Sequence, residues 1–132
     1  MTDRQEDRVE ALFQDAQALY QEALREMSEG KLRNAAEKAW GATMRATMAL
    51  VVARTGVEPG RSDQTSRALR ELSLADPSVS RRLSGAYYIR LNVLHGDCFY
   101  MGILDPTEYI ERLIRETHRY IRTARTLTRD GR

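Results

Sequence analysis

The stretch GKLRNAAEKAWGATMRATMALVVARTG, residues 30–56, decides the fold. Its apolar residues recur at the three-four spacing of an α-helix, and they form two stripes instead of one. One stripe consists mostly of alanines, and the other carries Trp40, Met44, Met48 and Val51. A helix with two apolar faces packs against neighbours on more than one side. The segment therefore predicts a central helix over residues 31–55, whose small side chains allow neighbouring backbones to approach closely.

Helical patterns continue on both sides of this segment. Residues 4–28 carry a single apolar stripe and are followed by Gly30, a residue type that often ends helices. Because only a very short turn joins this helix to the central one, the two should form an antiparallel pair. Asp76-Pro77 and Asp105-Pro106 each place a capping acid directly before a proline, which indicates a helix start. The predicted helices span residues 4–28, 31–55, 63–74, 77–100 and 106–127.

These elements define the fold class. No stretch of the sequence shows the alternation that is typical of a β-strand. We predict an all-α protein, an antiparallel four-helix up-and-down bundle with one additional short helix, as a single domain over residues 1–132. The last residues, 128–132, are expected to fray.

The composition favours a globular protein over a disulfide-bonded, secreted or membrane-spanning one. Hydrophobic residues make up 42% of the chain and charged residues 30%, as in soluble globular proteins. The single cysteine, Cys98, excludes an internal disulfide and favours a reducing cytoplasm. The charged N-terminus predicts no signal peptide, and the longest aliphatic run, residues 48–53, is too short to cross a membrane. All but two of the 21 basic residues are arginine, whose guanidinium groups bind phosphate and carboxylate well, so an anionic partner is allowed.

The predicted helix over residues 77–100 contains RLNVLHGD, residues 90–97. In a regular α-helix Arg90 and His95 are about 140° apart around the axis, so they would not share one face. Arg90 falls on the apolar stripe of its helix and should be buried, which is costly unless its charge is paired or faces a polar cleft. Two alternatives remain open: Arg90 faces a wet cleft between subunits, or it bonds an internal carboxylate. The candidate carboxylates are those of Glu22, Glu37 and Asp97.

An arginine and a histidine together can cleave RNA without a metal ion. Histidine titrates near neutral pH and can move a proton to or from the ribose 2′-hydroxyl, while arginine can hold the scissile phosphate. Two histidines and one cysteine offer too few ligands for a typical metal site, and the chain has no glycine-rich phosphate loop. We therefore expect neither a metal nor a cofactor.

These features resemble the HEPN family over nearly the whole chain. Residues 30–56 resemble that family's alanine-rich helix after a tight turn, and RLNVLHGDCFYMG, residues 90–102, resembles its arginine-histidine motif. The resemblance implies a homodimer in which Arg90 and His95 of both chains line one cleft. It implies a metal-independent ribonuclease, often a toxin of a toxin–antitoxin or defence system, or an inactive member that binds nucleotides or partner proteins. The position after the arginine, usually polar in active members, is Leu91 here, and Asn92 follows it.

We assign Arg90 and His95 as candidate catalytic residues, and Tyr88, Asn92 and Asp97 as candidate substrate-binding residues. In this hypothesis Arg90 binds phosphate and His95 transfers the proton. Tyr88 could stack on a base or pack with its hydroxyl in water, and Asp97 could orient His95, bond Arg90 or be solvated. The competing hypothesis is a non-enzymatic nucleotide-binding or protein-interaction module with the same fold. A third is a protein held inactive by a nucleotidyltransferase-like partner protein.

Overall fold

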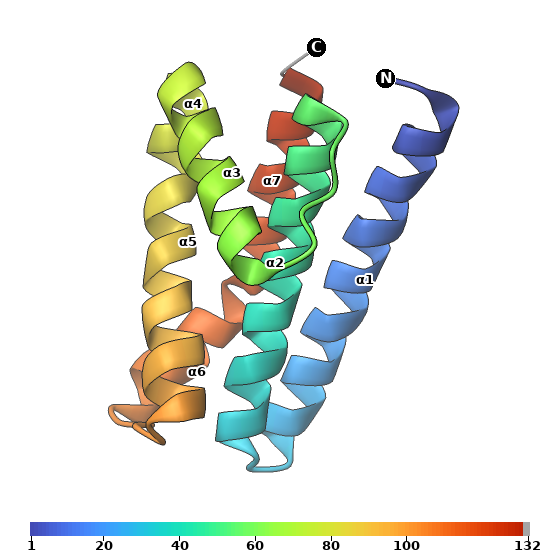
Figure 1. The fold of residues 1–132 in the computed structure, drawn as a ribbon. Coiled ribbons are helices and arrows are strands. Elements are labelled where there is room, and N and C mark those ends of the chain that lie inside the picture. The colour runs from blue at the N-terminus through green and yellow to red at the C-terminus, as the bar shows by residue number, and fades with distance from the viewer. Residues whose placement is uncertain (131–132) are drawn as a thin grey trace.

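Helices form every element of the computed structural model within the residues that it describes, 1–130 (Figure 1). In chain order they are α1 (Asp3–Ser28), α2 (Leu32–Thr55), α3 (Ser62–Ala75), α4 (Pro77–Val79), η1 (Ser80–Ser84), α5 (Gly85–Arg90), η2 (Leu91–Tyr100), α6 (Thr107–Arg115) and α7 (Thr117–Asp130). η1 and η2 are π-helical, and α4, η1, α5 and η2 follow one another as one long helix. The all-α class is confirmed, and the structure is compatible with a helical bundle.

Two further expectations concern the ends of the chain and membranes. Of the segment 128–132 that was expected to fray, residues 128–130 continue α7, and residues 131–132 lie outside the described part. Among the described helices, none combines the length and the hydropathy that crossing a lipid bilayer requires.

α1 and α2 run in opposite directions and are joined by a tight turn (Figure 1). The Thr2 hydroxyl accepts from the backbone N–H of Gln5, and the Gln5 side chain accepts in return from the backbone N–H of Thr2. This capping box satisfies two donors at the start of α1. In the turn, Gly30 has a φ of 79°, a left-handed conformation that glycine adopts without strain.

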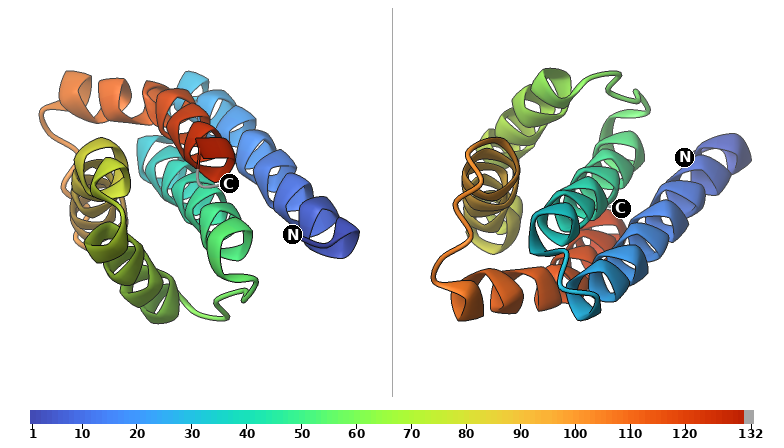
Figure 2. Two further views of the ribbon diagram at one scale, coloured as in Figure 1. Left: turned by 90° about the horizontal axis from the view of Figure 1, so that it is seen from above. Right: turned by 90° about the horizontal axis from the view of Figure 1, so that it is seen from below.

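α2 occupies the centre of the molecule. It lies between α1 and the long helix that contains α5, and α7 packs against it as well (Figure 2). Many of its fully buried side chains are alanines: Ala35, Ala36, Ala39, Ala42, Ala46 and Ala49. Because alanine is short, the neighbouring helices can approach α2 closely. A helix with neighbours on opposite sides needs two apolar faces, which is the pattern that residues 30–56 display.

The prediction of one helix over residues 106–127 is wrong, because the chain bends at Glu116 between α6 and α7 (Figure 2). In a continuous helix the Arg115 carbonyl oxygen would accept from the Arg119 N–H. Instead, that carbonyl accepts from the Tyr20 hydroxyl at 3.1 Å and lies 2.8 Å from Nδ1 of His118. The Arg119 N–H donates to the Glu116 carbonyl at 3.0 Å. A contact from α1 therefore stabilises the bend, and α6 points away from the direction of α7.

Ala46 tests the close packing of α2, because its side chain is fully buried. We expect Ala46→Leu to lower the free energy of unfolding by about 1–3 kcal/mol, since a larger side chain would overpack the core. Urea denaturation followed by circular dichroism measures the change. Ala18→Leu, on an exposed position of α1, is the matched control and should change stability by less than about 0.5 kcal/mol. Wild-type stability of Ala46→Leu would contradict the close packing.

Candidate functional site

His95 on η2 and Glu37 on α2 form the centre of the candidate site. The distance from His95 Nδ1 is 2.8 Å to Oε1 of Glu37 and 3.1 Å to Oε2. When the carboxylate accepts the Nδ1 proton, the lone pair of the neutral imidazole lies on Nε2. Within residues 1–130, Nε2 has no hydrogen-bond partner. The two side chains are 29% and 30% exposed, so water reaches the pair.

Aromatic side chains surround the imidazole of His95. The ring of Trp40 stacks on it at 5.8 Å between centroids, and the ring of Phe99 does so at 6.3 Å. Tyr100 meets its edge at 4.9 Å and is 69% exposed. Arg33 donates from Nε to the Phe99 carbonyl at 2.6 Å and places its guanidinium over the Phe99 ring. The imidazole therefore has an exposed aromatic ring beside it and an exposed cation close to its aromatic neighbours.

Arg90 is buried, as its place on the apolar stripe predicts, with only 3% of its surface exposed. Its Nε donates to Thr43 Oγ1 on α2 at 2.8 Å, and its Nη2 donates to Thr117 Oγ1 on α7. The second of the two alternatives, a bond from Arg90 to Glu22, Glu37 or Asp97, is not formed among residues 1–130: two threonine hydroxyls hold the guanidinium instead. The guanidinium joins three helices through these contacts.

The surroundings of Arg90 form a buried polar network. Burial lowers the pKa of Arg90 to about 10, while the neighbouring Tyr120 and Glu116 favour its charged form. Burial also raises the pKa of Tyr120, whose hydroxyl lies 2.7 Å from Thr47 Oγ1. Arg90 therefore remains charged at neutral pH, and Tyr120 remains protonated.

Arg90 and His95 both face α2, which corrects the expectation that they lie on different faces of their helix. Arg90 bonds Thr43, and His95 bonds Glu37, which lies nearer to the N-terminal end of α2. The physical reason is the π-helical backbone of η2, which begins at Leu91. Its i→i+5 bonds place more residues in each turn, so side chains five positions apart lie closer to one face.

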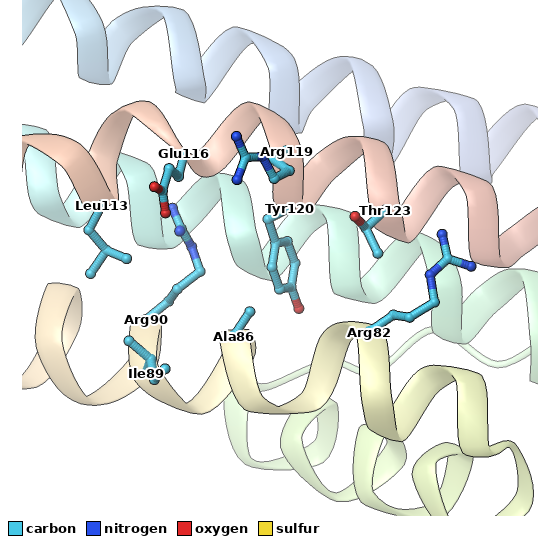
Figure 3. Close-up of a pocket in the computed structure, with 9 residues that line it drawn as sticks. All are labelled: Arg82, Ala86, Ile89, Arg90, Leu113, Glu116, Arg119, Tyr120 and Thr123. Carbon is cyan, nitrogen blue, oxygen red and sulfur yellow. The ribbon is translucent and has the colours of Figure 1, made fainter.

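The two side chains nevertheless reach different environments. The guanidinium of Arg90 extends from α5 towards the α6–α7 segment and lines a cavity there (Figure 3). His95 does not line that cavity. Within one chain, the arginine and the histidine therefore do not share a cleft.

Among residues 1–130, the other sequence-predicted residues form no hydrogen bond or ion pair with His95 or Glu37. The Tyr88 hydroxyl accepts from Arg70 Nε on α3 at 2.6 Å, and the Arg70 guanidinium covers its ring. Asn92 and Asp97 are exposed on η2, and Glu37 occupies the orienting position that was considered for Asp97. These contacts give Tyr88 a packing role.

Glu37 is one of the carboxylates that the sequence offers as a partner for Arg90. In the structure it is the partner of His95, which the sequence analysis does not predict. The available signal was that Glu37 lies three residues before Trp40, on the second apolar stripe of the central helix. An acid on an apolar stripe faces a neighbouring helix. Thr43 and Thr117 were missed as well, because threonine hydroxyls in helices usually bond to the backbone one turn earlier.

One family model matches the chain. It describes the archaeal PaREP1/PaREP8 family and matches residues 11–116. The chain belongs to this family. The match includes Glu37, Arg90 and His95, whereas Thr117 and Tyr120 lie just beyond it. No curated protein and no solved structure matches the chain. The resemblance to the HEPN family stays a prediction.

Thr43→Val tests how strongly Arg90 depends on its hydroxyl acceptors. Valine keeps the shape of threonine but leaves the Nε–H of a buried guanidinium without an acceptor. We expect the free energy of unfolding, measured in urea, to fall by about 1–3 kcal/mol. Thr126→Val is the matched control, because the Thr126 hydroxyl donates to the Arg122 carbonyl at a partly exposed position. Equal stability of the two variants would contradict this dependence.

Proposed function

We propose that this protein is a HEPN-type four-helix up-and-down bundle that binds RNA and cleaves it as a metal-independent endoribonuclease. The His95–Glu37 pair is the observation that carries the proposal. Its imidazole is held through Nδ1 by a carboxylate, its Nε2 has no hydrogen-bond partner among residues 1–130, and its side chain is 29% exposed. An imidazole in this arrangement can act as a general base and then as a general acid.

The proposed reaction begins when Nε2 of His95 removes the proton of a ribose 2′-hydroxyl. The 2′-oxygen then attacks the adjacent phosphorus, and the bond to the 5′-oxygen breaks. The products are a 2′,3′-cyclic phosphate and a 5′-hydroxyl, whose proton is supplied by the imidazolium or by water. Glu37 stabilises the imidazolium and keeps the ring oriented.

The burial of Arg90 changes the role that the sequence suggested for it. With Nε and Nη2 bonded to threonines, Arg90 positions the helix that carries His95. Contact with the phosphate is assigned instead to Arg33, an exposed cation beside the aromatic neighbours of His95. The HEPN resemblance supports a homodimer, in which a second His95 and a second Arg33 would join the same RNA-binding surface.

A non-catalytic protein-interaction or nucleotide-binding module is the second candidate. The burial of Arg90 favours it, because a guanidinium held inside the fold cannot grip a phosphate next to His95. Tyr100, Met101 and Ile103, which are 69%, 71% and 43% exposed, offer apolar surface for a partner. In this function RNA would remain intact.

Incubation of the purified protein with mixed single-stranded RNA in the presence of a chelator tests the proposal. We expect the wild type to cleave and His95→Ala to lose about 10²-fold or more of the cleavage rate, because the proton-transfer group is missing. His118→Ala is the matched control: His118 is the other histidine, it is exposed, and it bonds the Arg115 carbonyl. Its rate should equal that of the wild type.

Glu37→Gln adds a second readout to this experiment. Glutamine keeps the shape of the side chain but removes the charge that stabilises the imidazolium, so the rate should fall by a smaller factor than in His95→Ala. Product analysis should detect 2′,3′-cyclic phosphate ends. Cleavage that His95→Ala retains in full would remove His95 from the mechanism. Intact RNA with the wild type at all concentrations would favour the module.

A further inference from the structure

A second site lies apart from the His95–Glu37 pair. It is a cavity of about 200 Å³ between α5 and the α6–α7 segment (Figure 3). Its wall includes the side chains of Ala86, Ile89 and Leu113, and the ring of Tyr120. For comparison, an apolar protein cavity of about 150 Å³ holds a benzene molecule. A ligand of one ring or one short branched chain, with a single polar substituent, therefore matches this volume.

The buried guanidinium of Arg90 supplies the polar end of the cavity. Its Nε and Nη2 donate to threonine hydroxyls, whereas Nη1 has no hydrogen-bond partner among residues 1–130. Arg90 lines the cavity and is 3% exposed, so Nη1 has little other access to water. Nη1 is not among the fully buried polar atoms that lack a partner, so it has some contact with solvent, and a ligand that accepts from this charged donor gains a strong hydrogen bond.

The charges around the cavity select the class of ligand. Three arginines, Arg82, Arg90 and Arg119, line the cavity together with one acid, Glu116 (Figure 3). Positive charge therefore exceeds negative charge in the lining, which favours an anionic ligand. A phosphate dianion would bring more negative charge close to the Glu116 carboxylate than a carboxylate ligand would. The apolar wall opposite favours a ligand with an apolar body.

We propose that this cavity binds a small organic carboxylate with an apolar body, such as an aromatic or branched-chain acid. The carboxylate accepts from Nη1 of Arg90 and from the Arg119 guanidinium. The apolar body packs against Ala86, Ile89 and the ring of Tyr120. The ligand joins α5 to α7, the same two helices that Arg90 and Thr117 hold together, so its binding stabilises the fold.

A titration of the full-length protein with benzoate, followed by isothermal calorimetry, tests the proposal. We expect saturable binding of benzoate by the wild type, and none of benzyl alcohol, its neutral analogue. Arg119→Gln should weaken benzoate binding about tenfold, because one charge-assisted hydrogen bond is lost. Arg122→Gln, at another exposed position of α7 that does not line the cavity, is the matched control and should bind as the wild type does.

Two further measurements separate loss of the site from loss of the fold. Ala86→Leu places a larger side chain at an exposed position of the wall, so it should abolish benzoate binding while the circular dichroism spectrum stays that of the wild type. Inorganic phosphate is titrated in parallel. Tighter binding of phosphate than of benzoate would overturn the carboxylate assignment. Absence of benzoate binding by the wild type, or equal binding by Ala86→Leu, would overturn the site. Neither result depends on RNA cleavage.

Discussion

A buried guanidinium constrains the arrangement of this fold. Arg90 donates from Nε to α2 and from Nη2 to α7, because a charged group without hydrogen bonds would be strongly unfavourable in the core. Its bonds to Thr43 and Thr117 fix how α5 sits against both helices. The chain continues directly from Arg90 into η2. The register that Arg90 sets on α2 therefore also sets where His95 meets Glu37.

The fold was largely accessible to sequence reasoning because its strongest signals are local. Two apolar stripes over residues 30–56 indicate a helix with neighbours on opposite sides, and α2 has them. The bend at Glu116 was not accessible. Nothing in the pattern of residues 106–127 interrupts the apolar stripe, and the bend is stabilised by the Tyr20 hydroxyl, which belongs to a helix about ninety residues earlier. A tertiary hydrogen bond of that kind leaves no local trace in the sequence.

Some features of the candidate site could likewise be predicted from the sequence, and others could not. The burial of Arg90 follows from its position on an apolar stripe, so the sequence predicts it. The hydrogen-bond acceptors of Arg90 could not be predicted in this way. A buried cation suggests a carboxylate partner, whereas the structure uses the neutral hydroxyls of Thr43 and Thr117. The sequence also does not predict that the His95 side chain faces α2. That direction depends on the π-helical backbone of η2, whereas spacing arguments assume the α-helical turn.

In the proposed ribonuclease function, the separation of Arg90 from His95 gives structure and chemistry to different residues. Proton transfer at His95 needs an accessible Nε2 and an orienting carboxylate, and both are present in one chain. Stabilising the charge that develops on phosphorus needs a cation near the exposed end of η2, and Arg33 meets that requirement through its contacts with Phe99. Arg90 can then keep its place in the core, because moving it out would leave Thr43 and Thr117 without their shared partner. In this proposal Arg90, which has the HEPN-like spacing to His95, holds helices together, and Arg33 would contact the phosphate.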